Sequence, residues 1–205
     1  MKKRKIKIIH IINNLSTGGA ERMLFNLVSC ADINRFDIVV FSLQGKGELS
    51  IEIEKLGIPI FYFGIFRKRD FVLKFLKLIL AIIKLKPDLV QTWLYQSNII
   101  GGVATKIGSS SKIIWSLHAT ILKPGLTKKS SKFIIKLSSI MSGFIPDKII
   151  CCSQSSCNDH KVIGFKENKM IVIPNGINLT TFNTINKNKS NLINGLKLGE
   201  EIKFI

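Results

Sequence analysis

The sequence predicts an α/β fold: a parallel sheet of about seven strands with helices on both faces. Short apolar runs alternate along the chain with longer segments of helical spacing, which is the order of βαβ units. The first unit, residues 7–27, joins a strand to a helix through a short loop with two glycines. Strands are expected at Lys7–Ile12, Phe36–Leu43, Ile58–Phe63, Asp88–Trp93, Lys112–Leu117, Asp147–Cys152 and Lys169–Ile173.

The first unit has the residues of a buried strand, a tight turn and a helix start. Lys7–Ile12 is rich in isoleucine, as in strands that are covered on both faces. Asn13–Thr17 is small and polar, and Gly18 and Gly19 would let the backbone turn without Cβ clashes. Free N–H groups at the start of the following helix, Ala20–Leu27, are suited to an anion. On residue chemistry alone, a plain βα turn and a ligand-binding loop both remain open.

Further helices are expected at Leu49–Leu56, Phe66–Lys86, Ser97–Ile107 and Lys128–Phe144, and another starts at Ser153. The segment Phe66–Lys86 is the most apolar, but it carries lysines at 74, 77 and 84 that fall near one helical face. A helix that spans a membrane tolerates few charges, so we expect a crossover helix that packs on the sheet. A helix that lies on a membrane surface is the alternative.

Composition gives a large basic surface and a sizeable core. The 205 residues are 46% hydrophobic and carry a net charge of +18. Such a surface attracts anions, and basic residues interleaved with phenylalanine and isoleucine suit anionic lipid better than nucleic acid, for which no binding motif is present. The four cysteines match no zinc pattern and are expected to be reduced, buried and structural, as in the cytosol. The start of the chain has too short an apolar run for a signal peptide.

Three stretches carry a resemblance to a known family. They are STGGAER after the first strand, DLVQTWLYQSNIIGGVATK at Asp88–Lys106, and KIICCSQSSCNDHKVIGFKENKMIVIPNGINLTTF at Lys148–Phe182. In this order they resemble the retaining, nucleotide-sugar-dependent glycosyltransferases of family four, also called group 1. That family has the GT-B fold, in which two Rossmann-like domains face each other across a cleft. The resemblance implies that residues 1–175 form the N-terminal, acceptor-binding domain. Residues 176–205 would be the hinge and the first strand of a truncated C-terminal domain.

The resemblance also suggests site residues. His118 ends the fifth strand, where family members often carry a histidine that lines the cleft, and it is the candidate catalytic residue. Gly18, Gly19 and Thr17 match the loop that approaches the donor diphosphate. Substrate contacts are further expected from Trp93 and Asn98, although the strand end Gln91–Trp93 lacks the histidine common in the family. Asn175 and Gly176 are expected at the hinge. Of the other histidines, His10 is expected in the core and His160 exposed.

The implied function is transfer of a sugar, of the hexosyltransferase kind, from a nucleotide sugar to a glycan or lipid-linked acceptor in surface polysaccharide or glycolipid synthesis. No cofactor or metal is expected. The donor-binding cations and glutamates belong to the family's C-terminal domain, so this chain is expected to be inactive alone and to need that domain in cis or in trans. A cytoplasmic location is expected, with peripheral contact at the inner membrane face. The alternative is a non-catalytic, truncated or split domain that binds a partner protein or an anionic membrane.

Overall fold

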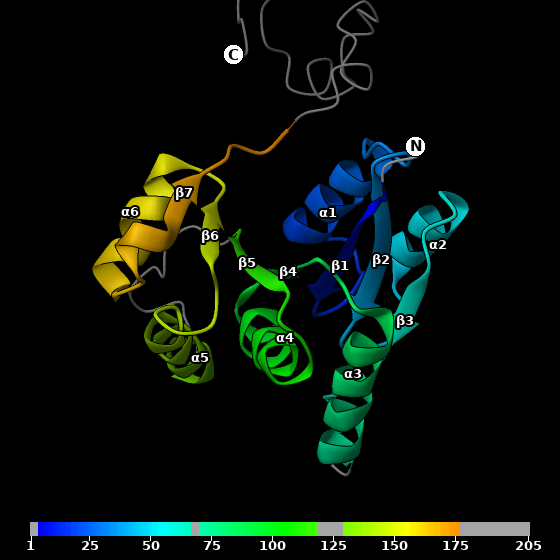
Figure 1. The fold of residues 1–205 in the computed structure, drawn as a ribbon. Helices are drawn as coiled ribbons and strands as arrows, with labels where there is room; N and C mark the ends of the chain where they lie inside the picture. The colour runs from blue at the N-terminus through cyan, green and yellow to red at the C-terminus, as the bar shows by residue number, and fades with distance from the viewer. Residues whose placement is uncertain (1–3, 67–69, 119–128, 177–205) are drawn as a thin grey trace, which may run out of the picture.

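The computed structural model describes residues 4–66, 70–118 and 129–176. Their elements alternate as predicted (Figure 1). The strands are β1 (Ile6–Ile12), β2 (Phe36–Ser42), β3 (Ile60–Tyr62), β4 (Leu89–Trp93), β5 (Lys112–Leu117), β6 (Lys148–Cys151) and β7 (Met170–Val172). The helices are α1 (Gly19–Ser29), α2 (Glu48–Lys55), α3 (Phe71–Leu85), α4 (Tyr95–Gly108), α5 (Lys129–Met141) and α6 (Gln154–Ile163), with a 3-10 turn, η2, at Glu167–Lys169.

All seven strands pair in parallel in the order β3-β2-β1-β4-β5-β6-β7. The predicted α/β class, the strand number and the parallel sheet are therefore confirmed. The strand order reverses at β1, which lies between β2 and β4. Such a switch point brings the loops after β1 and β4 together at the carboxyl edge of the sheet, where open α/β folds bind ligands.

The helices divide unequally between the two faces of the sheet. Right-handed crossovers place helices on opposite faces when the chain reverses its direction across the sheet. On one face, α1 and α2 pack against β1 and β2 through Leu24, Val28, Leu49 and Ile53. On the other face, α3 and α4 cover the centre of the sheet, while α5 and α6 cover β5 and β6. Figure 1 shows α3, α4 and α5 side by side along that face.

The face that carries α1 and α2 is only half covered. Within the described residues no helix lies over β5 to β7 on that side, whereas Trp93 of β4 still joins the cluster under α1 and α2. The alternation along β5 and β6 shows the consequence, since Ile113 and Ile149 are fully buried whereas Ile114 and Ile150 are partly exposed. Parallel sheets are normally buried on both faces, so the described residues leave this strip of sheet without its usual cover.

Helix α3 is a crossover helix, as its sequence predicts. It begins at Phe71, after an acidic residue, Asp70, and its last turn closes at Lys86 in the left-handed conformation that ends many helices. Leu78, Ile79 and Ile82 pack on the sheet. Within the described residues no helix is long and apolar enough to cross a membrane.

Candidate functional site at the carboxyl edge of the sheet

The loop after β1 carries the two glycines, and their geometry differs from the one expected. Gly18 has an extended backbone with φ −154°, and neither glycine has a positive φ. A Cβ on Gly19 would meet nothing within 4 Å, and one on Gly18 would meet the carboxylate of Glu21 at 2.3 Å. The backbone angles therefore do not require glycine at either position. A Cβ would displace the Glu21 carboxylate at Gly18, whereas the space beside Gly19 is open.

Neighbouring polar side chains fix this loop. The Thr17 hydroxyl donates to the Glu48 carboxylate, at the first residue of α2. Asn13 joins the loop to the start of α4, because its amide donates to Gln96 Oε1 at 2.9 Å and its Oδ1 accepts from the Ser97 hydroxyl at 2.6 Å. The loops after β1 and β4 thus form one bonded unit. A substrate role for Thr17 stays a prediction, and its hydroxyl proton is already engaged.

His118 lies directly after β5, at the same edge. Its imidazole is half-buried and stacks on the Trp93 indole, with ring centroids 4.9 Å apart and planes 16° apart. Burial lowers the pKa of His118 below its ordinary value. The imidazole is therefore neutral at pH 7 and keeps one nitrogen as a hydrogen-bond acceptor. A sugar hydroxyl can donate a hydrogen bond to this nitrogen.

Trp93 is almost entirely buried at 3% exposed, and its indole Nε1–H donates to His10 Nδ1 at 3.3 Å. His10 lies in the core, as predicted, and burial lowers its pKa to about 4. Because Nδ1 accepts the indole proton, the neutral ring carries its own hydrogen on Nε2. The substrate contact predicted for Trp93 is consequently limited to a small exposed part of its side chain.

Asn98 lies inside the structure rather than at its surface. It is fully buried in α4 and hydrogen-bonds the Thr92 hydroxyl at 2.6 Å. The substrate contact expected of this side chain stays a prediction. On the opposite side of β4, Gln91 donates to the Ser116 hydroxyl at 2.7 Å. Both pairs hold β4 at the edge where the site lies.

His160 is buried, so the prediction that it is exposed is wrong. Its Nδ1 donates to the Ser156 carbonyl at 2.6 Å, and its Nε2 accepts from the Tyr95 hydroxyl at 2.6 Å. Burial lowers the pKa of His160 and raises that of Tyr95. The pair ties the start of α4 to α6. A histidine at helical spacing among polar residues resembles a surface residue in sequence, and only the position of α4 reveals the partner.

The hinge and cysteine predictions have mixed outcomes. Asn175 and Gly176 are exposed at the end of the described chain, and Gly176 lines a cavity of about 850 Å³ together with α1 and the exposed side of β1 and β4. Their hinge role stays a prediction, and residues 177–205 lie outside the described residues.

All four cysteines are free; Cys151 and Cys157 are buried, but Cys30 is exposed, contrary to expectation. The described residues hold no cluster of three or more metal-ligating side chains.

Comparison with protein families assigns the chain. The model for Glycosyltransferase Family 4 matches residues 17–181. The chain belongs to this family. It is 26% identical over 187 residues to an Escherichia coli UDP-Gal:alpha-D-GlcNAc-diphosphoundecaprenol alpha-1,3-galactosyltransferase, a match that covers 87% of the chain and 46% of the relative. It is 40% identical over 76 residues to the Staphylococcus aureus capsular polysaccharide biosynthesis glycosyltransferase CapH, which covers 36% of the chain and 21% of CapH.

Solved structures agree on the fold of this family 4 chain. The crystal structure of Anabaena HepE in complex with UDP-glucose superimposes with a TM-score of 0.75 at 21% identity. The match covers 94% of the chain and 50% of HepE. The chain thus has the Rossmann-like architecture of one half of a GT-B glycosyltransferase. The E. coli relative and HepE each match most of this chain, and the chain spans about half the length of each of them.

Proposed function

We propose that this chain is the acceptor-side domain of a glycosyltransferase that transfers a sugar from a nucleotide sugar to a glycan or lipid-linked acceptor in surface polysaccharide or glycolipid synthesis. The observation that carries the proposal is the carboxyl edge of the sheet, where the open glycine loop and the neutral His118 flank β4. Family membership supports the reaction class. The E. coli relative, which acts on a diphosphoundecaprenol-linked sugar, supports the acceptor class.

Each residue has a distinct part in this proposal. The open space at Gly19 lets the donor diphosphate approach the N-terminal turn of α1, whose free N–H groups favour an anion. The His118 imidazole accepts a hydrogen bond from a sugar hydroxyl and orients it. No metal or other cofactor takes part. Retaining transfer needs donor and acceptor held together with water excluded, which one half of a cleft does not achieve.

The half-covered sheet face supports a second domain as partner, in cis or in trans. Ile114 and Ile150 remain partly exposed on this face. A large cavity against α1 borders the last described residue, Gly176. The relatives are about twice as long as the matched region. We therefore expect the 205-residue chain alone to transfer no sugar, and activity to need the donor-binding half.

The test is a transfer assay on the complete gene product with UDP-galactose and UDP-glucose as donors and GlcNAc-diphosphoundecaprenol as acceptor. We expect labelled sugar in the lipid extract with one donor, and loss of transfer in His118→Ala. The matched control is His160→Gln, which changes a histidine outside the site. Transfer that survives His118→Ala unchanged would remove His118 from the proposal. Absence of transfer by the wild-type protein would favour the alternative, a non-catalytic domain that binds a partner or a membrane.

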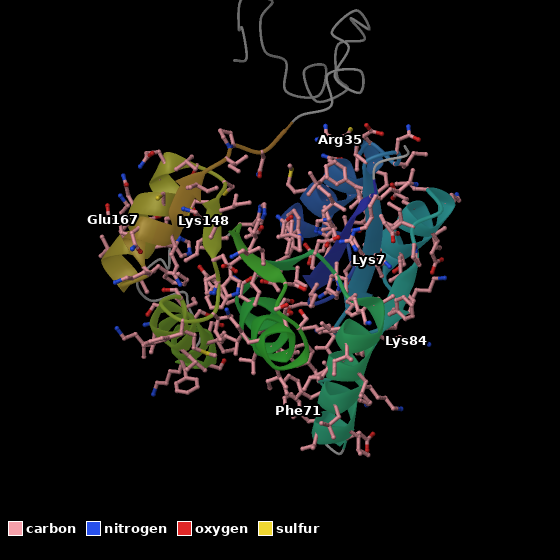
Figure 2. All side chains as sticks on the ribbon, in the orientation of Figure 1. Lys7, Arg35, Phe71, Lys84, Lys148 and Glu167 are labelled. Carbon is pink, nitrogen blue, oxygen red and sulfur yellow. The ribbon has the colours of Figure 1, made fainter. Side chains whose placement is uncertain are left out.

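A peripheral contact at the inner membrane face is the second part of the proposal, and the outer side of α3 supports it. Val72, Leu73, Leu76, Leu80 and Ile83 are exposed, with Leu73 at 64% and Leu80 at 62%. Lys77 and Lys84 flank this apolar stripe. Figure 2 shows side chains projecting from α3 away from the sheet, between Phe71 near one end and Lys84 near the other. An apolar stripe with lysines beside it suits an anionic lipid surface.

Vesicle co-sedimentation tests this contact. We expect the chain to pellet with phosphatidylglycerol vesicles more than with phosphatidylcholine vesicles, because the lysines add attraction for anionic head groups. Lys77→Gln with Lys84→Gln should reduce the preference for anionic lipid, and Leu76→Gln with Leu80→Gln should reduce binding to both. Equal sedimentation of wild type and all variants would exclude α3 as the contact.

A further inference from the structure

Three side chains from three neighbouring strands form a continuous row on the half-covered face. Trp93 pairs with Ile12 on one side and with Ser116 on the other. His10 lies two residues before Ile12, and His118 lies two residues after Ser116. Because side chains alternate along a strand, all of these residues share one face. The row runs from the buried centre at His10, through Trp93, to the edge at His118.

Each member of the row is held by the one before it. His10 is 2% exposed, and its Nδ1 accepts a hydrogen bond from the indole N–H. This bond fixes the orientation of the Trp93 ring. The indole in turn offers a flat apolar surface to the His118 imidazole at 4.9 Å. Offset or parallel aromatic contacts of this kind contribute about 0.5–1.5 kcal/mol beyond burial. His118 thus rests on a rigid support although it follows the last residue of a strand.

The backbone next to Trp93 is strained, which is an independent observation. Leu94 has φ 71° and ψ 157°, a conformation that glycine adopts readily and leucine does not. Such a residue costs about 1–3 kcal/mol and persists only where its surroundings hold it. Here the Leu94 N–H donates to the Ser116 carbonyl at 3.3 Å and the Leu94 carbonyl accepts from the Asn98 N–H at 2.9 Å. Strain of this kind gathers at functional sites.

We propose that Trp93 is a positioning residue for His118: its indole, anchored on the buried His10, sets the plane and the location of the imidazole that faces the acceptor. The inference rests on the proposed function for its chemical meaning. It assigns Trp93 a role through His118 rather than a direct contact with substrate. The geometric part, that Trp93 holds His118, stands on the contacts alone and is measurable without turnover.

The first experiment is NMR on the 205-residue chain. The chain has three histidines, so single substitutions assign their ring protons. The indole ring current should displace the His118 ring protons upfield, and NOEs should connect them to the Trp93 ring. Trp93→Phe should retain part of the displacement, and Trp93→Leu should abolish it, with His160 unchanged in both. Wild-type protein without these NOEs and without the displacement would overturn the inference even if no variant folds.

The second experiment measures transfer by the complete gene product with UDP-galactose and GlcNAc-diphosphoundecaprenol. Trp93→Leu should lower kcat by about 10- to 100-fold, as expected of a displaced catalytic group, with KM for UDP-galactose unchanged. Trp93→Phe should recover most of the rate. In a His118→Ala background, Trp93→Leu should cause no further loss, because both changes remove one function.

The two experiments separate the possible failures. A further loss in the double variant, or a rise of KM with kcat unchanged, would assign Trp93 to structure or to substrate binding and overturn the positioning role. If wild-type protein transfers no sugar with these substrates, the proposed function fails for them, while the NMR comparison still decides whether Trp93 holds His118.

Discussion

The two faces of the sheet differ in both cover and chemistry. The face under α3, α4, α5 and α6 has an apolar core that includes Ile9, Ile11 and Val90, with buried polar pairs such as Thr92 and Asn98 beside it. On the opposite face, the helices of the described residues, α1 and α2, lie beside β1, β2 and β3 and leave β5 to β7 uncovered. This face carries buried polar side chains, among them Gln91 and Ser116.

Under the proposed function, this difference separates the part of the chain that maintains the fold from the part that would carry out the chemistry. Burying a polar group raises the free energy of the folded state unless the group is hydrogen-bonded, so apolar side chains would stabilise the fold with fewer requirements. The half-covered face instead keeps two buried hydrogen-bonded pairs, Trp93 with His10 and Gln91 with Ser116. Together with the strain at Leu94, this indicates that stability was not the only requirement on that side.

The largest effect on stability is expected from shortening a buried side chain on the covered face. Ile149 and Ile150 are neighbours on β6 that point to opposite faces, the first fully buried and the second partly exposed. Ile149→Ala should lower the free energy of unfolding by about 2–5 kcal/mol, and Ile150→Ala by about 1 kcal/mol, because only the first leaves a cavity. Urea unfolding of both variants measures the difference. Equal losses would mean that both faces are covered in solution.

The second-largest effect is a pH dependence of stability that arises from His10, which is buried on the half-covered face. Its pKa falls from 6.5 in the unfolded chain to about 4 in the folded one. Between these values the unfolded chain binds the proton and the folded chain does not, so stability falls as the pH drops. At about 1.4 kcal/mol per pKa unit, the loss from pH 7 to pH 4 is about 3 kcal/mol.

Urea unfolding at pH 7, 5.5 and 4.5 measures this loss. His10→Gln keeps an acceptor for the indole and does not titrate, so its stability should fall less over this range. Burial also lowers the pKa values of His118 and His160, which contribute the remaining slope. An identical pH dependence in wild type and His10→Gln would contradict the assignment.

Much of this fold follows from local patterns. Strand composition and the alternation with helices place all seven strands, with the fifth, Lys112–Leu117, correct to the residue. Helix ends are less predictable: α4 begins at Tyr95 rather than Ser97, because Leu94 adopts an unusual conformation that no sequence pattern announces. The apolar α3 is correctly assigned to the sheet, since its three lysines indicate a helix that does not span a membrane.

The site was harder to predict because it depends on strand order. His118 follows from its place after a strand, but its contact with Trp93 requires that β4 and β5 are neighbours and in register. The bond from Trp93 to His10 joins residues 83 positions apart. His160 was misplaced for the same reason, since its partner Tyr95 lies on a distant element. Alternation within a strand gives the face of a side chain, not its neighbour on the next strand.

A smaller effect on stability is expected to distinguish two glycines near the carboxyl edge of the sheet, Gly47 and Gly19. Gly47→Ala should lower the free energy of unfolding by about 1–3 kcal/mol, because its Cβ would lie 2.4 Å from the Leu15 backbone. Gly19→Ala has open space and should change stability by less than about 0.5 kcal/mol. Thermal unfolding compares the two. If Gly19→Ala nevertheless abolishes transfer by the complete protein, the missing Cβ serves a ligand; unchanged transfer would assign Gly19 to a plain loop.

The smallest effect on stability is expected from a substitution on the exposed side of α3, the side that points away from the sheet. Ile79 packs on the sheet, whereas the adjacent Leu80 is 62% exposed. Leu80→Gln should change the free energy of unfolding by less than about 0.5 kcal/mol, because the side chain loses no packing. Urea unfolding measures it, with Ile79→Gln as the destabilised control. A loss from Leu80→Gln as large as that of the control would mean that another surface already covers α3 in solution. The apolar stripe would then be part of a protein interface rather than free for a membrane.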